Sequence, residues 1–321
     1  MSVFGEKIDA GENVRNIVES DTCVVMQMAD ESGEGTMTAH RIFEGAHLMY
    51  NDFHMASCRS GFSLQNNGDF LVIDHCREGR IESEVKPGVF SFMQEHEMRI
   101  DNRKNHSGSV FFPLKHYHGI TIGFDLSVTT EEIQKVFPGF SVDLRDIQAK
   151  FVTGDCPFVL KNEPGVEHIF SELYQVPRNM KSDYYKLKAL ELLLYLDALQ
   201  VLNAKEERPY FYKGQVEKIK AVQELITSDL KRHYTTEELS KRFSVSPTAL
   251  KNVFKEIYGD SLYSYLRRIR MNAAASMLIQ APEKSIGEIA NEVGYENQGK
   301  FSTAFKNVIG QTPLEYRNAN R

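Results

Sequence analysis

Two groups of polar side chains near the end of the chain have residue types and spacing suited to contacts with a nucleic acid. Each group lies on a stretch with helical periodicity and would face outward from it. Hydroxyl, amide and ammonium groups of this kind form hydrogen bonds with phosphate oxygens and base edges. The outward positions are Thr248, Lys251, Asn252 and Lys255 in the first group, and Gln298, Lys300, Ser302, Thr303 and Lys306 in the second.

The elements that carry these side chains form an internal repeat. Residues 235–259 and 285–310 share one helix-turn-helix pattern, with an offset of 50 residues before the turn and 51 after it. The extra residue falls at the turn, where a loop accepts an insertion at small cost. A chain with two such units can place two helices in DNA. Matching pairs include Leu239 with Ile289, Phe254 with Phe305, and Gly259 with Gly310.

Residues at each turn predict where the second helix of the unit begins. Ser246 is suited to the N-cap and Pro247 to the first helical position, where the missing N–H costs nothing. Asn297 is the matching N-cap in the second unit. Gly294 follows the supporting helix of the second unit, where a left-handed backbone is favoured. Ser244 has the matching position in the first unit, where its side chain makes that conformation less favourable than it is for glycine. We expect the two units at about 236–257 and 286–308.

A strong helical pattern joins the two units, from Leu262 to about Leu278. At ~1.5 Å per residue, these 17 residues span ~25 Å. Such a helix would hold the two outward helices roughly one turn of B-DNA apart, which is ~34 Å. Arg267 and Arg270 on this helix add positive charge for the phosphate backbone.

The net charge of −6 conceals an asymmetry along the chain. Residues 215–321 carry 16 basic and 12 acidic side chains, a net charge of +4. The preceding 214 residues carry 22 basic and 32 acidic side chains, a net charge of −10. A basic segment attached to an acidic one favours a polyanionic partner for the basic segment.

The rest of the chain divides by pattern. Short segments rich in branched and aromatic residues, separated by turn residues, predict a small β-sandwich or barrel within 1–160. The pattern becomes helical over 161–204, and the polar stretch 205–214 predicts a linker before a helical domain at 215–318. The fold class is therefore multidomain, with a β N-terminal domain and an all-α C-terminal domain.

One predicted helix, Asp183 to Leu202, is too apolar for a surface helix. Its leucines cover more than half of its circumference, so several of its sides must be buried. Both the core of a helical subdomain and the interface of a homodimer would meet this requirement, and the sequence does not choose between them.

The C-terminal repeat resembles the DNA-binding domain of the AraC/XylS family of bacterial transcription regulators. The resemblance rests on SLYSYLRRIRMNAAASML, SIGEIANEVGYENQGKFSTAFK and the closing GQTPLEYR. It implies a double-stranded DNA site read in two successive major grooves, with RNA polymerase as a further partner. The implied base-reading residues are Thr248, Lys251, Asn252, Gly299, Lys300 and Thr303. Because several of these side chains are small, we expect DNA shape to contribute to recognition.

The resemblance also implies a cupin-like N-terminal domain with a helical dimerisation subdomain, which senses a small-molecule effector. Strand alternation places His116 and His118 on one face with Ile120, and His75 and Arg77 on one face with Ile73. If those apolar residues face the barrel interior, the four polar residues lie near its mouth and would bind an anion or a metal. Structural or surface histidines are the competing interpretation, because the pattern of a metal-bearing cupin is missing.

The remaining features exclude several classes of protein. The sequence has no Gly-rich phosphate loop, GxSxG or HExxH motif, so we expect neither an enzyme nor a bound cofactor. It has no apolar run of ~18 residues and no signal-like start, and its four scattered cysteines suit a reducing cytoplasm. The leading interpretation is a ligand-responsive activator. The alternatives are a cupin-type metalloenzyme with a DNA-binding appendage and an effector-independent DNA-binding protein.

Overall fold

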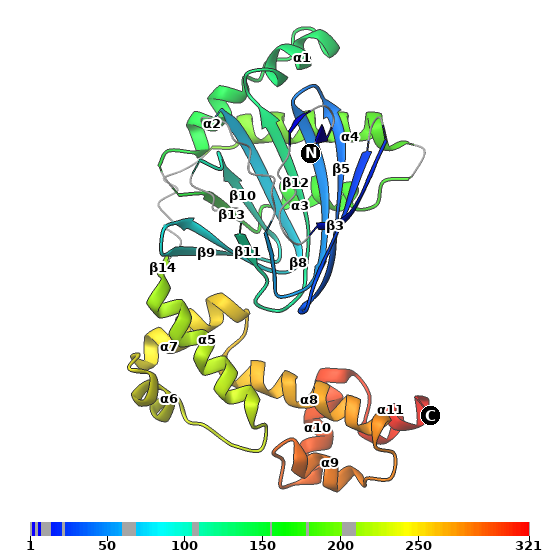
Figure 1. The fold of residues 1–321 in the computed structure, drawn as a ribbon, viewed down its shortest axis with the longest axis vertical. Coiled ribbons are helices and arrows are strands. Elements are labelled where there is room, and N and C mark those ends of the chain that lie inside the picture. The colour runs from blue at the N-terminus through cyan, green and yellow to red at the C-terminus, as the bar shows by residue number, and fades with distance from the viewer. Residues whose placement is uncertain are drawn as a thin grey trace. The chain divides into compact units, whose positions relative to one another are not determined.

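The structure is a computed structural model that describes residues 2–3, 6–7, 14–20, 23–59, 69–104, 109–154, 156–177, 180–200 and 210–320. The chain divides into two compact units, Met1–Phe211 and Tyr212–Arg321. The first unit combines a large antiparallel sheet with helices, and the second is helical (Figure 1). The β-then-helix order expected from the sequence is therefore present.

The large sheet of the first unit has the strand order β13-β10-β8-β12-β6-β5-β4-β3. Strands β7, β9 and β11 join it through the second half of β8 or through one another. The strands are β1 (Ser2–Val3), β2 (Glu6–Lys7), β3 (Val14–Glu19), β4 (Cys23–Asp30), β5 (Gly33–Phe43), β6 (Ala46–His54), β7 (Ser57–Arg59), β8 (Phe70–Lys86), β9 (Val89–Gln94), β10 (Glu97–Asp101), β11 (Ser109–Phe111), β12 (Tyr117–Asp125) and β13 (Phe158–Lys161).

Strand β8 differs from the sequence-based expectation. The short strands expected within 1–160 are separated by turn residues, and Gly79 would be one of these because glycine commonly marks a turn. Instead β8 is continuous, and Gly79 has a left-handed φ of 83° within it. A Cβ at Gly79 would lie 2.1 Å from the carbonyl oxygen of His116. The glycine therefore permits a close backbone approach at a bend and does not end the strand.

The sheet is apolar on both faces, and each face has its own core. One core combines sheet residues such as Ile73 and Ile122 with residues of four helices. These are α1 (Thr129–Val136), α2 (Leu144–Phe151), α3 (Pro164–Leu173) and α4 (Lys181–Ala198). The other core lies on the concave face and consists of residues from strands and their connections, including Met26, Met37 and Tyr117. Figure 1 shows the strands curving away from the helices.

Helix α4 lies across the sheet and is mostly buried, with Leu192, Leu193 and Leu196 fully inaccessible. It ends at Ala198, before the expected end at Leu202, and residues 201–202 lie outside the described part of the chain. Leu187 and Leu194 stay exposed, at 63% and 46%. The helix therefore belongs to the core of the first unit and also exposes two leucines. This arrangement is compatible both with the subdomain core and with the homodimer interface considered from the sequence.

A charged cluster is buried on the concave face of the sheet. Asp74 accepts hydrogen bonds from Arg99 Nε (3.0 Å), from Arg103 Nη2 (2.8 Å) and from the Thr121 hydroxyl (2.8 Å). Arg99 also donates to the Ser83 hydroxyl at 2.9 Å. Because every polar group in this cluster has a partner, the charges tie β8, β10 and β12 together without an unpaired ion in the core.

The second unit consists of α5 (Lys213–Ser228), α6 (Thr236–Phe243), α7 (Pro247–Tyr258), α8 (Leu262–Gln280), α9 (Ile286–Glu292), α10 (Gln298–Ile309) and α11 (Pro313–Ala319). Helix α8 runs between α5–α7 at its start and α9–α11 at its end (Figure 1). Among the described residues, no helix is long and apolar enough to cross a membrane.

The expected linker at 205–214 is shorter than the sequence indicated. Phe211 and Tyr212 form the short strand β14, and α5 already begins at Lys213. The Gln215 side chain accepts a hydrogen bond from the backbone N–H of Tyr212 (3.4 Å), which supports this early start. Residues 205–209 lie outside the described residues.

Asp74→Asn should destabilise the first unit by about 3–5 kcal/mol, because it leaves Arg99 buried without its counterion. Burial alone would raise the pKa of Asp74, but Arg103 and Arg99 outweigh it and hold the pKa at about 2. An unfolded aspartate has a pKa of about 3.9, so the carboxylate stabilises the fold above about pH 4 and loses this effect as the pH falls toward 2. Urea denaturation measured over this pH range checks both statements.

Asp69 supplies the matched control, because its ion pair with Arg145 (3.3 Å) is exposed on both sides. Asp69→Asn should change the free energy of unfolding by less than about 1 kcal/mol. Equal effects of the two substitutions at neutral pH would contradict a stabilising role for the buried cluster.

Candidate nucleic-acid interface

The two recognition helices, α7 and α10, are built in the same way. Each has 12 residues and begins at a side-chain cap. Ser246 Oγ accepts from the N–H of Ala249 (3.2 Å), and Asn297 Oδ1 accepts from the N–H of Lys300 (2.9 Å). Gly259 and Gly310 end the helices with φ of 85° and 88°. The predicted N-caps at Ser246 and Asn297, and the predicted start at Pro247, are confirmed.

The inward faces of both helices are buried. Leu250, Phe254, Phe301 and Phe305 are inaccessible or nearly so, and each helix packs on its supporting helix, α6 or α9. On the supporting helix α6, Phe243 packs less closely, since it is only half-buried at the end of that helix. This packing fixes the roll of each recognition helix and therefore decides which side chains face outward.

A cleft of about 740 Å³ lies within the second unit, and residues of both recognition helices line it. Its lining carries the cations Lys251, Lys255, Arg267, Arg270 and Lys300, against the single carboxylate of Glu296. Cations gathered in a concave surface attract a polyanion more strongly than the same charges spread over a convex one. The cleft is therefore a candidate surface for the phosphate backbone and the base edges between the two helices.

The structure brings six of the predicted residues together in this cleft, namely Lys251, Asn252, Lys255, Arg267, Arg270 and Lys300. The other six lie on the same two helices outside its lining. Of these, Thr248, Gln298, Gly299, Thr303 and Lys306 are exposed and Ser302 is half-buried. The Thr303 hydroxyl donates to the carbonyl of Gly299 (3.0 Å), which leaves its oxygen free to accept a hydrogen bond from outside.

Sequence reasoning overlooked three tyrosines that line the cleft, Tyr234, Tyr263 and Tyr295. Tyr263 is 70% exposed, and the Arg267 guanidinium lies 5.7 Å from its ring centroid. The sequence does contain a signal for Tyr263. It lies two positions after the helix cap at Ser261 and one turn before Arg267, and residues at this spacing share one helix face.

Arg270 is placed differently from the other predicted cations. It is only 5% exposed, and its Nη2 donates to the backbone carbonyl of Arg232 (3.1 Å). Burial lowers the pKa of Arg270. Its guanidinium holds the loop before α6, so phosphate contact is at most a second role for this side chain.

Three of the four predicted effector residues, His75, Arg77 and His118, lie on the side of the sheet that the helices cover, and His116 lies in the connection before β12. Ile73 and Ile122 belong to the core that the helices cover, so the condition that they face the barrel interior is not met. His75 accordingly stacks on Phe170 of α3, with ring centroids 4.2 Å apart. A register shift between His118 and Gly119 further breaks the alternation on which the expectation relied.

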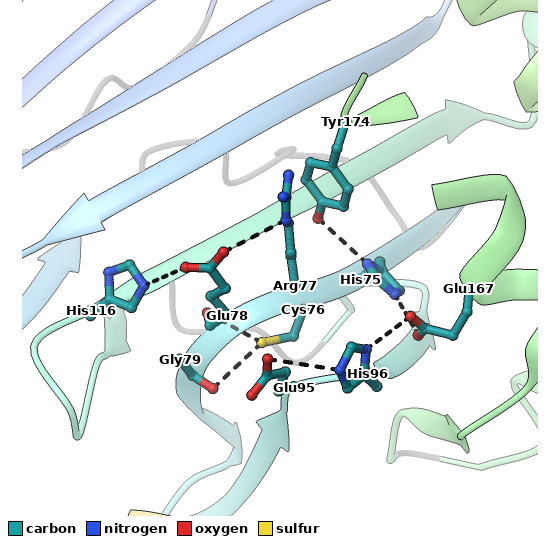
Figure 2. A network of polar contacts seen from close by, with 10 residues as sticks. All are labelled: His75, Cys76, Arg77, Glu78, Gly79, Glu95, His96, His116, Glu167 and Tyr174. Carbon is teal, nitrogen blue, oxygen red and sulfur yellow. Dashed lines mark hydrogen bonds and ion pairs between the residues drawn. The ribbon is translucent and has the colours of Figure 1, made fainter. Parts of the chain in front are cut away.

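Three of the four residues, His75, Arg77 and His118, converge on Tyr174 at the end of α3, and Figure 2 shows His75 and Arg77 beside it. Its hydroxyl lies 3.4 Å from Nδ1 of His75, and the Arg77 guanidinium lies 4.7 Å from its ring centroid. The ring of His118 is 5.4 Å away, edge-on. His116 is connected to this group through Glu78, whose Oε2 lies 3.4 Å from Nε2 of His116 and whose Oε1 lies 3.7 Å from Nε of Arg77 (Figure 2).

Glu167 on α3 joins this group to the turn before β10 (Figure 2). Its two carboxylate oxygens lie 2.9 Å from Nε2 of His75 and 2.9 Å from Nδ1 of His96. Burial would raise the pKa of Glu167, but the hydrogen bonds from the two histidines outweigh it and leave the pKa lowered. The polar groups around His75 thus hold α3 on the sheet. Among the described residues, no group of three or more His, Cys, Asp or Glu side chains has a metal-binding arrangement.

Comparison with known proteins bears on the second unit. A family profile described as a helix-turn-helix domain matches residues 239–319. The bifunctional transcriptional activator/DNA repair enzyme AdaA of Bacillus subtilis (strain 168) is 36% identical over 100 residues, which are 31% of this chain and 47% of AdaA. The HTH-type transcriptional activator RhaR of Klebsiella pneumoniae subsp. pneumoniae is 31% identical over 96 residues, which are 30% of this chain and 34% of RhaR. This chain thus spans less than half of the length of these relatives.

Among solved structures, a transcriptional regulator with an AraC-type DNA-binding domain from Chromobacterium violaceum is 26% identical, with a TM-score of 0.31. The match covers 33% of this chain and 95% of that one. Residues 239–319 are thus a helix-turn-helix domain. More narrowly, the second unit is a helix-turn-helix domain of the AraC type, as the sequence predicted.

Neighbouring residues on α7 separate binding from folding. Lys251 is exposed in the cleft, so Lys251→Ala should raise the dissociation constant for a bound DNA duplex by roughly fivefold or more and lower the salt slope by about one. Leu250 is 1% exposed, so Leu250→Ala should cost about 2–5 kcal/mol of stability. Gel shifts at two salt concentrations and thermal melts measure the two effects. An unchanged affinity for Lys251→Ala would exclude this side chain from the interface.

Proposed function

We propose that this protein is a sequence-specific DNA-binding transcription regulator that acts as an activator in response to a small molecule. The observation that carries the proposal is the basic cleft, to which α7, α8 and α10 all contribute cations. The printed names of AdaA and RhaR, both called transcriptional activators, support the regulatory role. The cytoplasm, where bacterial DNA and RNA polymerase lie, is the compartment that fits this role.

In this proposal α7 and α10 enter successive major grooves on one face of the duplex. Lys251, Asn252 and Lys300 reach base edges, and Thr248, Gly299 and Thr303 allow close approach of the helix backbone. Lys255, Lys306 and Arg267 neutralise phosphates at the borders of the grooves. Small side chains at several reading positions favour a contribution from DNA shape.

The first unit is proposed to be a cupin-like domain that binds the effector. Its curved sheet and its core of methionines support this, since flexible methionine side chains adapt to varied contacts. His75, Arg77 and His118 would act around Tyr174 by transmitting a change at α3, and His116 would be connected to them through Glu78.

A homodimer formed through α4 completes the proposal. Leu187 and Leu194 are seven residues apart and therefore lie on one stripe of the helix, with the exposed Glu191 between them. Exposed leucines at heptad spacing on a helix whose opposite face is buried support pairing with the same helix of a second chain.

The purified full-length protein should retain a small set of DNA fragments from the genome that encodes it. Sequencing of these fragments should yield a motif with two parts about one helical turn apart, because two helices read it. The Lys251→Ala and Lys300→Ala variants should each weaken retention and degrade a different half of the motif. Retention without any common motif, or a motif that both variants degrade in the same half, would overturn the proposal.

The double substitution Leu187→Arg and Leu194→Arg should convert a dimer into a monomer of about 36.7 kDa, because each arginine would place a charge in the stripe. Light scattering after size-exclusion chromatography measures the mass. Val136→Arg is the control, since Val136 is similarly exposed (52%) but lies on α1. A dimer that survives the double substitution and dissociates with Val136→Arg would place the interface elsewhere.

A further inference from the structure

The two helix-turn-helix units also touch at a place beside α8. The loop between α5 and α6 meets the turn between α9 and α10, and we call this contact the junction. Its members are Leu230, Arg232 and His233 from the loop, Gly294 from the turn, and Arg270 from the middle of α8. Three of them, His233, Gly294 and Arg270, also line the cleft together with Tyr295.

Hydrogen bonds and close packing hold the junction. His233 Nε2–H donates to the carbonyl of Gly294 at 3.0 Å, and Arg270 Nη2 donates to the carbonyl of Arg232 at 3.1 Å. A Cβ on Gly294 would lie 2.5 Å from the carbonyl oxygen of Leu230 and 3.1 Å from Cζ of Arg270. Since the nearest atom belongs to the backbone, any side chain at this position would push the turn away from the loop.

The repeat shows that the turn itself does not require a glycine. Ser244 holds the matching place in the first unit with φ of 51°, and its carbonyl accepts from Nζ of Lys218 at 3.1 Å. Both positions are left-handed, but only the second turn packs against another loop. The glycine at 294 is therefore required by the contact between the units as well as by the backbone conformation.

The proximity of these groups has a mechanical consequence. Helix α8 alone fixes the distance between the units, but a single helix leaves bending and twisting about its axis as soft motions. A second contact away from the helix axis removes much of that freedom. The junction lies beside the first residues of α10, which begins four residues after Gly294.

We propose that the junction of Arg270, His233 and Gly294 sets the separation and rotation of α7 relative to α10, and so selects the spacing between the two halves of the DNA site. This inference rests on the proposed function. These residues are positioning residues, because they act through the two helices and not through their own contacts with bases.

The test compares one DNA site at three spacings. A duplex is first selected from a randomised pool by the full-length protein, and one base pair is then inserted or removed between its two halves. One base pair changes the separation by about 3.4 Å and the rotation by about 35°. Fluorescence anisotropy gives the dissociation constants, and the spacing ratio is the altered-spacing constant divided by the selected-spacing constant.

The wild-type protein should show a spacing ratio of about tenfold or more, since a shifted half-site loses its base contacts. Gly294→Ser, which copies the residue of the first turn, should weaken binding at the selected spacing and lower the ratio to below about threefold. His233→Ala should lower the ratio in part. It removes one hydrogen bond of an exposed side chain and therefore tests the same contact if Gly294→Ser fails to fold.

Gly310→Ser is the matched control. Gly310 has a similar φ of 88°, but a Cβ there meets nothing within 4 Å. It should therefore carry the same backbone strain and leave the spacing ratio unchanged. The inference is supported if the spacing ratio falls for Gly294→Ser and His233→Ala and does not fall for Gly310→Ser.

Equal weakening at all three spacings, with the ratio preserved, would overturn the inference while leaving the DNA-binding function intact. Failure of the wild-type protein to select any sequence would instead overturn the proposed function, and the inference with it.

Discussion

The C-terminal unit depends on one helix that is buried in two cores at once. The first half of α8 packs into the first helix-turn-helix unit, where the ring of Tyr265 lies 5.4 Å from that of Phe254 and 5.0 Å from that of Tyr258. Its second half supplies Met271 and Leu278 to the core around Phe301. Because both halves are anchored by packing, each recognition helix is fixed to its own half of α8, and α8 sets the distance between them. Everything proposed about DNA recognition follows from this constraint.

Charge is distributed to match that geometry. The chain as a whole is acidic, yet the surface between α7 and α10 presents five cations and one carboxylate. Several acidic residues of this unit lie outside the cleft, in the first turns of helices. Examples are Glu238, Glu288 and Glu315. The net charge of a two-domain chain therefore says little about its partner, and the local charge of one concave face says more.

The sequence predicted the helical unit well and the β unit only in outline. Caps such as Ser246 and Asn297 are local signals, and their hydrogen bonds involve residues three positions away, so a single sequence contains them. The face of a strand is a different kind of information. Alternation placed His75 and Ile73 on one side of β8, but both sides of β8 are buried, and Glu167 of α3, which contacts His75, comes 92 residues later. The bend at Gly79 and the junction at Gly294 were hidden for the same reason, since both depend on contacts between distant segments.

The central claim is that two rigidly linked helices hold one face of a DNA duplex. Hydroxyl-radical footprinting of the full-length protein on a retained genomic fragment measures this directly. The account predicts two protected backbone patches per protein chain, on the same face of the duplex and separated by about one helical turn. A single patch per chain, or two patches on opposite faces, would contradict it.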